Sequence, residues 1–123
     1  LDLGGIAKGQ AADAMLEVFF KYGLRSTSIT CGGDVRVGDP PPGKNHWAIA
    51  IKTTGDRKPP LQLANQAVST SGDLYQFIKI DGQRYSHIID PKTGLGLTES
   101  KSATIVATTA TESDALATSA CVA

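Results

Sequence analysis

The stretch Tyr85–Gly94, YSHIIDPKTG, contains residue types that can do acid–base chemistry at the end of a strand. His87 stands three residues before Asp90, and a Pro-Lys-Thr-Gly turn sequence follows. Histidine titrates near neutral pH, so His87 is a candidate general base, and Asp90 is a second candidate. A lone histidine on a strand is more often structural. By itself, the stretch therefore predicts only a hairpin strand that ends in a turn.

A carboxylate and a hydroxyl stand together near the end of the sequence, in ESDALATSA. Asp114 and Thr118 are four residues apart, so on a helix their oxygens lie on one face. Such oxygens suit a hard cation such as Mg²⁺, which keeps several waters and takes few protein ligands. The alternative is an acidic first turn that interacts with the helix dipole and a threonine that bonds back to the helix backbone. The pair alone leaves both interpretations open.

Two glycine pairs stand beside charged residues. In DLGGIAKG the pair precedes an expected helix, where free N–H groups attract phosphate and Lys8 adds a positive charge. In CGGDVRVG the pair precedes Asp34, which could bond a ligand from the end of a strand. DLGGIAKG fits neither the P-loop pattern nor G-x-G-x-x-G. Taken alone, each stretch is more simply explained by a glycine turn.

The elements that must position these residues follow from local patterns. Apolar side chains recur at helical spacing over residues 6–22, and residues 26–38 predict two short strands around a glycine bend. Alternating runs on both sides of Asp81-Gly82 predict a hairpin. Further strands are expected at 46–53, 61–72 and 101–110, loops at 39–45 and 54–60, and a helix from Glu112 onward. This order indicates an α+β domain with a mostly antiparallel sheet and flanking helices.

The composition is that of a single globular domain over residues 1–123. Lys plus Arg and Asp plus Glu both number 12, so no basic excess favours nucleic acid and no charge run favours a membrane surface. No signal peptide is visible, and no apolar run approaches the roughly 18 residues of a spanning helix. The sequence opens without methionine on an apolar segment and ends in an expected helix that has no cap or turn signal, so we expect a domain that is truncated at both ends. Cys31 and Cys121 could pair only if the fold brings them together.

Five stretches together resemble the ApbE-type flavin transferases in order and rough spacing: DLGGIAKGQAAD, CGGDVRVG, VSTSGD, RYSHIIDPKTG and ESDALATSA. The resemblance covers nearly the whole chain. It implies a T-fold-like ApbE domain, of which this chain would be the C-terminal part. It also implies that the protein cuts FAD with the help of Mg²⁺. FMN would then pass to a serine or threonine hydroxyl of a redox-pump type flavoprotein subunit, through a phosphoester bond, and AMP would leave.

The resemblance also implies roles for individual residues. Asp114 and Thr118 match a metal-binding pair, which the backbone carbonyl of Gly5 completes. His87 matches the histidine suspected of activating the acceptor hydroxyl, and Asp90 opens the family's Asp-Pro-x-Thr-Gly turn. The expected contacts with the nucleotide or flavin come from Lys8, Asp34, Ser71, Gly72 and Asp73.

Two other functions use the same residues. One is a Mg²⁺-dependent FAD pyrophosphatase that releases FMN and AMP, and the other is a flavin-binding domain without catalysis. Modification of an acceptor protein distinguishes transfer from hydrolysis. The resemblance further implies that the longer protein is periplasmic and held at the inner membrane by a lipid, although this sequence contains no such signal.

Overall fold

The computed structural model describes residues 3–51, 58–73 and 76–123. The described residues form a four-stranded antiparallel sheet in the order β1-β2-β5-β8, together with the two ribbons β3–β4 and β6–β7. The expected α+β class with flanking helices is confirmed. In chain order the elements are α1 (Ala7–Lys21), β1 (Ser28–Cys31), β2 (Asp34–Val37), β3 (Trp47–Ile49), β4 (Leu61–Leu63), β5 (Ala67–Gly72), β6 (Phe77–Ile80), β7 (Gln83–Ser86), β8 (Ser102–Ala107) and α2 (Ala110–Val122).

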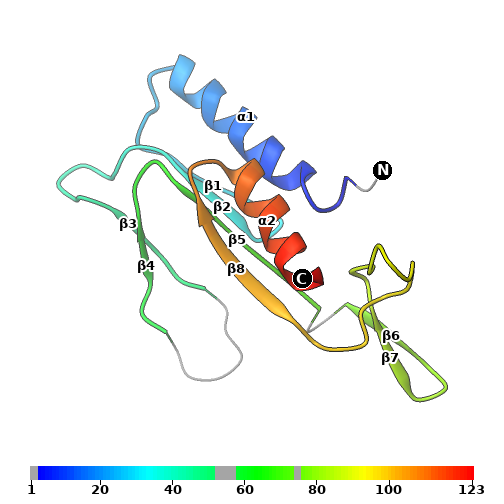
Figure 1. Ribbon diagram of the computed structural model, residues 1–123. Coiled ribbons are helices and arrows are strands. Elements are labelled where there is room, and N and C mark those ends of the chain that lie inside the picture. Colours follow the sequence, from blue (N-terminus) through cyan, green and yellow to red (C-terminus); the bar gives the residue numbers. More distant parts are fainter. Residues whose placement is uncertain (1–2, 52–57, 74–75) are drawn as a thin grey trace.

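Both helices cover one face of the four-stranded sheet (Figure 1). α1 packs on β1 and β2, α2 packs on β5 and β8, and the two helices contact each other. The helices approach closely because Gly9 of α1 faces the first residue of α2. A Cβ added at Gly9 would lie 2.2 Å from the carbonyl oxygen of Ala110. The N-terminal turns of the two helices therefore meet above the sheet. Small and branched side chains fill this core: Ala12, Leu16, Ile29, Ala67 and Ala110.

The β3–β4 ribbon contributes to a second cluster, which contains Val37, Leu63 and Val68. The expectation of one strand over residues 61–72 was wrong, because the chain turns at Asn65, where φ is 53°. Asparagine adopts this left-handed conformation more readily than most residues. The turn sends β4 into the ribbon with β3 and leaves β5 in the main sheet.

α2 begins two residues before the expected start at Glu112. Thr109 caps the helix, since its Oγ1 accepts a hydrogen bond from Glu112 N at 3.2 Å. The Glu112 carboxylate accepts from Thr109 N at 3.2 Å in return. This reciprocal capping box explains why the helix starts at Ala110.

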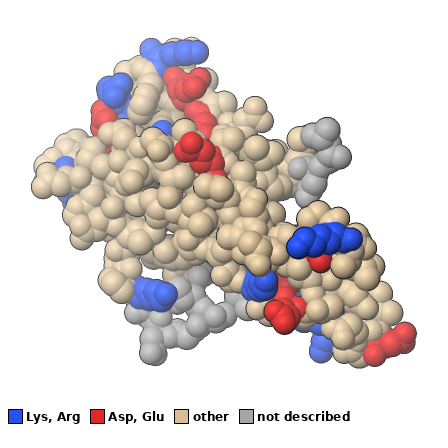
Figure 2. All heavy atoms as spheres, viewed as in Figure 1, with Lys and Arg blue, Asp and Glu red and all other residues tan. Residues whose placement is uncertain are grey.

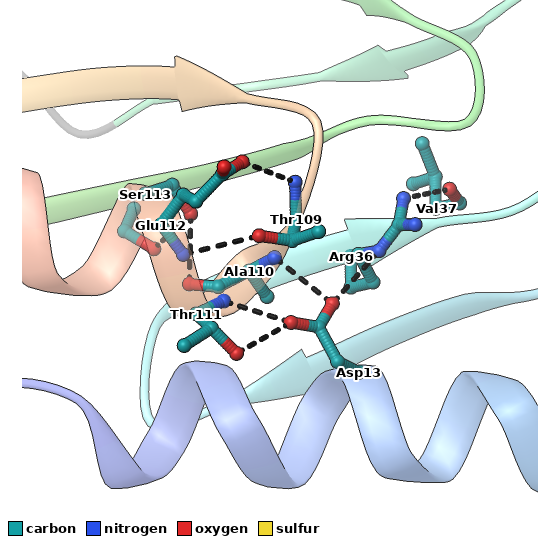
Figure 3. A network of polar contacts seen from close by, with 9 residues as sticks. Asp13, Arg36, Val37, Thr109, Ala110, Thr111, Glu112 and Ser113 are labelled. Atoms are coloured by element: carbon teal, nitrogen blue, oxygen red, sulfur yellow. Dashed lines mark hydrogen bonds and ion pairs between the residues drawn. The ribbon is translucent and has the colours of Figure 1, made fainter.

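A carboxylate from α1 adds a second cap to α2 (Figure 3). Asp13 accepts hydrogen bonds from the backbone N–H groups of Ala110 and Thr111, each at 2.9 Å, and from Thr111 Oγ1 at 2.7 Å. Arg36 of β2 donates to the same carboxylate at 3.0 Å. Burial raises the pKa of Asp13, but the hydrogen bonds from Thr111 and Ala110 outweigh it and hold the pKa below its usual value. Asp13 thereby ties the start of α2 to α1 and the sheet.

Neither sign of charge dominates the face of the molecule shown in Figure 2. On that face, basic and acidic side chains are interspersed among mostly uncharged atoms. Cys31 and Cys121 are both free thiols. Among the described residues, no helix combines the length and apolar character that a membrane crossing requires.

Candidate functional site

A cleft of about 700 Å³ opens where the turn before α1, the end of β5, the segment after β7 and the C-terminal half of α2 meet. These segments are far apart in the sequence, and only the fold brings them together. Of the residues expected to act, the cleft is lined by Gly5, Lys8, Ser71, Gly72, His87 and Thr118.

The carboxylate of Asp114 lies at the base of this site and is 1% exposed. Its Oδ2 accepts a hydrogen bond from the backbone N–H of Gly9 at 2.9 Å. This N–H belongs to the first turn of α1, where backbone donors have no partner within the helix and the dipole attracts negative charge. The other oxygen, Oδ1, accepts from Lys8 Nζ at 2.9 Å. One oxygen of Asp114 is thus anchored to the backbone, while the other holds a positive charge.

Asp34 is a second buried carboxylate beside Lys8. The tight β1–β2 turn at Gly32 and Gly33, where φ is 58° and 102°, places it at the start of β2. Its Oδ2 lies 3.5 Å from Lys8 Nζ and accepts no hydrogen bond from the described residues. Burial and the charge of Asp114 raise the pKa of Asp34. A buried, unsatisfied carboxylate oxygen of this kind favours an additional positive charge or donor at the site.

Thr118 lies one turn of α2 beyond Asp114. Its Oγ1 is 2.9 Å from Ser71 Oγ on β5, so one hydroxyl donates to the other. Gly5 packs against Thr118, and a Cβ added at Gly5 would lie 3.4 Å from Thr118 Oγ1. Of the residues expected to bind metal, Gly5 and Thr118 thus lie side by side on the cleft, and Asp114 lies one turn of α2 before Thr118.

This donor set fits a hard cation. The described segments contain no group of three or more His, Cys, Asp or Glu side chains that could hold a metal ion. A cation here would instead be bound by one carboxylate oxygen of Asp114, the Thr118 hydroxyl, a backbone carbonyl and water. Mg²⁺ commonly binds in this way, with one or two carboxylates and several waters.

His87 lies on the cleft wall, directly after β7. Its Nδ1 is 3.1 Å from the carbonyl oxygen of Gln76. A carbonyl can only accept a hydrogen bond, so Nδ1 carries the proton in the neutral imidazole. Nε2 then keeps its lone pair and can accept a proton. This is the tautomer that a general base at the cleft requires.

Four of the expected site residues do not themselves line the cleft. Asp34 and Asp114 contact Lys8, which does line it, whereas Asp90 and Asp73 have other partners. Asp90 shapes the turn after β7: its Oδ1 accepts from Lys92 N at 2.8 Å, and it borders a separate cavity of about 340 Å³. Asp73 is buried, and its carboxylate accepts hydrogen bonds from Arg84 at 2.5 Å and from Ser100 at 2.9 Å. Arg84 also donates to the backbone carbonyl of Asp73. The described geometry gives both aspartates structural partners.

The sequence model of the ApbE family matches residues 1–123. The chain belongs to the ApbE family. The ApbE protein of Thermotoga maritima superimposes with a TM-score of 0.88 at 40% identity, over 99% of this chain and 40% of that one. The apo flavinyl transferase ApbE of Pseudomonas stutzeri gives a TM-score of 0.83 at 31% identity, over 99% of this chain and 39% of that one.

Curated ApbE relatives carry the name FAD:protein FMN transferase. The protein from Treponema pallidum is 37% identical over an alignment of 132 positions, which covers 96% of this chain and 36% of the relative. The protein from Chlamydia muridarum is 36% identical over 100 residues, which are 81% of this chain and 30% of the relative. This chain thus spans about a third of the length of these curated relatives.

Two residues that support the ApbE site have no signal in the sequence. Gly9 donates to Asp114, which is 105 residues away, and Asp13 caps the helix that carries Asp114 and Thr118. Each helix therefore supplies a carboxylate to the N-terminus of the other. An alanine-rich helix with one aspartate gives no indication of such a distant partner.

The Asp73–Arg84 pair gives a test of stability. The hydrogen bond from Arg84, aided by those from Ser100 and Ser86, outweighs burial and lowers the pKa of Asp73 from 3.8 to about 2. The ionised Asp73 carboxylate therefore contributes its full stabilisation above its ordinary pKa of 3.8. This stabilisation is lost as the pH falls through about 2. Asp73→Asn leaves Arg84 without its charged partner, and we expect the free energy of unfolding to fall by about 3 kcal/mol at pH 7. Urea denaturation at pH 7 and between pH 4 and pH 2 measures both effects.

The matched control for this measurement is Asp81→Asn, in the exposed β6–β7 turn. We expect it to change stability by less than about 0.5 kcal/mol. We also expect the difference between the wild type and Asp73→Asn to shrink as the pH falls. A difference that stays constant down to pH 2 would show that the Asp73 charge contributes nothing.

Proposed function

We propose that this chain carries the catalytic centre of an FAD:protein FMN transferase. The observation that supports this best is one cleft lined by both His87 and Thr118, with Asp114 one helical turn from Thr118. Phosphoryl transfer requires positioning and neutralisation of charge more than covalent chemistry by the protein. A site for a hard cation and a proton acceptor on one cleft meet those requirements. The names of the ApbE relatives support the same reaction.

The reaction joins an acceptor hydroxyl to the FMN phosphate. The hydroxyl oxygen of a serine or threonine attacks the flavin-side phosphorus of FAD, the bond to the bridging oxygen breaks, and AMP leaves with that oxygen. Nε2 of His87 takes the proton from the attacking hydroxyl. Mg²⁺ bound by Asp114, Thr118 and the Gly5 carbonyl would neutralise charge on the diphosphate. Ser71 and Gly72 form the wall of the cleft along the end of β5.

The acceptor that we propose is a flavoprotein subunit of the redox-pump type with an exposed threonine or serine. We also propose that the longer protein acts in the periplasm, held at the inner membrane by a lipid. Both proposals are supported by the resemblance of the five motifs to the family.

The direct test is to incubate the purified protein with FAD, Mg²⁺ and an acceptor subunit, and then to weigh the subunit by mass spectrometry. Transfer adds one FMN phosphoester to the subunit and releases one AMP. A subunit whose acceptor threonine is replaced by valine is the control and should not gain mass. Free FMN and AMP without modified subunit would identify a pyrophosphatase. Intact FAD that binds without turnover would identify a flavin-binding domain.

A further inference from the structure

The ammonium group of Lys8 lies among three oxygens. Nζ is 2.9 Å from Asp114 Oδ1, 3.1 Å from the carbonyl oxygen of Gly4 and 3.5 Å from Asp34 Oδ2. Two carboxylates and a backbone carbonyl are also the ligand types that hard divalent cations use. Lys8 therefore occupies a position that has the chemistry of a cation site.

Lys8 holds the oxygen of Asp114 that is not bonded to α1. Asp114 Oδ2 accepts from the backbone N–H of Gly9, and this contact fixes the carboxylate against the start of α1. Oδ1 faces a positive charge, and the Lys8 ammonium already holds it. A metal ion that replaces a cation contact of Asp114, and leaves the contact with α1 in place, binds Oδ1. The ammonium and the metal ion therefore compete for one oxygen.

The charge count favours the metal ion. Asp34 and Asp114 are 2% and 1% exposed, and Lys8 is the one cation paired with them in the described part of the chain. One ammonium leaves a net negative charge among these groups when both carboxylates are ionised. Buried charge without a partner is costly, and a divalent cation would balance it.

Lys8 is able to leave this position. Its side chain is 37% exposed and lines the cleft, so the ammonium can swing into solvent without unfolding α1. Its stem passes over Gly32, where an added Cβ would lie 2.8 Å from Lys8 Cδ. The absence of a side chain at Gly32 thus leaves the room that the lysine stem uses. The buried carboxylates, by contrast, have no comparable freedom.

We propose that Lys8 is a tethered counterion of the metal site. Its ammonium holds Asp114 Oδ1 in the metal-free protein, and a divalent cation takes this place and releases the ammonium into the cleft. The inference rests on the proposed function only in placing the metal at Asp114. The released ammonium then faces whatever anionic group the cleft binds. In this way a positive charge accompanies the two buried carboxylates before the metal arrives.

The first test is Mg²⁺ binding, measured by calorimetry without flavin or acceptor. Lys8→Met keeps the apolar stem and removes the competing charge, so we expect Mg²⁺ to bind roughly 10- to 100-fold more tightly. The control is Lys21→Met, at the far end of α1, which should leave the affinity unchanged. Equal affinity in the wild type and Lys8→Met would overturn the proposal, and so would the absence of Mg²⁺ binding to both proteins.

The second test separates direct occupation from a general effect of charge. Lysine amines of the wild type are acylated with and without saturating Mg²⁺, and the modified peptides are quantified by mass spectrometry. We expect labelling of Lys8 to rise at least several-fold with Mg²⁺, while the exposed Lys21 and Lys79 stay unchanged. Unchanged labelling of Lys8 at saturating Mg²⁺ would overturn the exchange. Neither test measures FMN transfer. The exchange at Lys8 can therefore be overturned while the protein still transfers FMN, and it can be confirmed in a protein that does not transfer FMN.

Discussion

Asp114→Asn is expected to lower Mg²⁺-dependent FMN transfer by more than about 100-fold. Loss of a residue that only hydrogen-bonds to a metal ligand typically costs about 10- to 100-fold, and loss of a ligand's charge should cost more. The amide still offers an oxygen to Gly9 N, so the contact that anchors the side chain to α1 is kept. What is lost is the negative charge that pairs with Lys8 and that we expect to bind the cation. Calorimetry should show weaker Mg²⁺ binding, and circular dichroism should show a folded protein.

The control for Asp114→Asn is Glu112→Gln on the same helix. Glu112 is exposed, and glutamine also serves at this position of a capping box. We expect this variant to keep both Mg²⁺ affinity and turnover. Unchanged Mg²⁺ affinity in a folded Asp114→Asn protein would show that the metal binds elsewhere.

His87→Gln is expected to slow FMN transfer by about 10²- to 10⁴-fold, the usual contribution of a general base. The loss should appear in turnover and not in FAD binding, because the proton moves only as the transition state forms. Single-turnover rates and FAD titrations measure the two properties separately.

The chain contains two histidines, so His46→Gln is the matched control. His46 does not line the cleft, and its replacement should leave transfer unchanged. If His87 only packs the hairpin, its substitution lowers stability but leaves the rate per folded molecule intact. A near-normal rate per folded molecule would therefore exclude His87 as the base.

Local patterns in the sequence were sufficient to predict most elements of the fold. The helix expected over residues 6–22 is α1, and the Asp81-Gly82 turn joins β6 to β7 as expected. These elements depend on side-chain periodicity and on turn residues that lie within a few positions of each other. The physical causes are local, so the sequence displays them directly.

The errors in the fold prediction arose where a single residue redirected the chain. The strand expected over 61–72 is broken at Asn65, whose positive φ separates two strands that belong to different sheets. The start of α2 was placed too late because Thr109, and not the acidic residue at position 112, is the cap. The apolar pattern continues across both boundaries. The backbone conformation of Asn65 sets the first boundary, and capping by Thr109 sets the second.

The candidate site divides in the same way. The sequence by itself determined that Asp114 and Thr118 share a helix face, because four residues make about one helical turn. Only the tertiary structure decided that Gly9 anchors Asp114, that Lys8 joins Asp114 to Asp34, and that Arg84 takes Asp73 away from the cleft. The close contact of α1 with α2 brings Gly9 and Lys8 to Asp114, and the tight β1–β2 turn adds Asp34. Such contacts join residues from distant parts of the chain, and no local pattern records them.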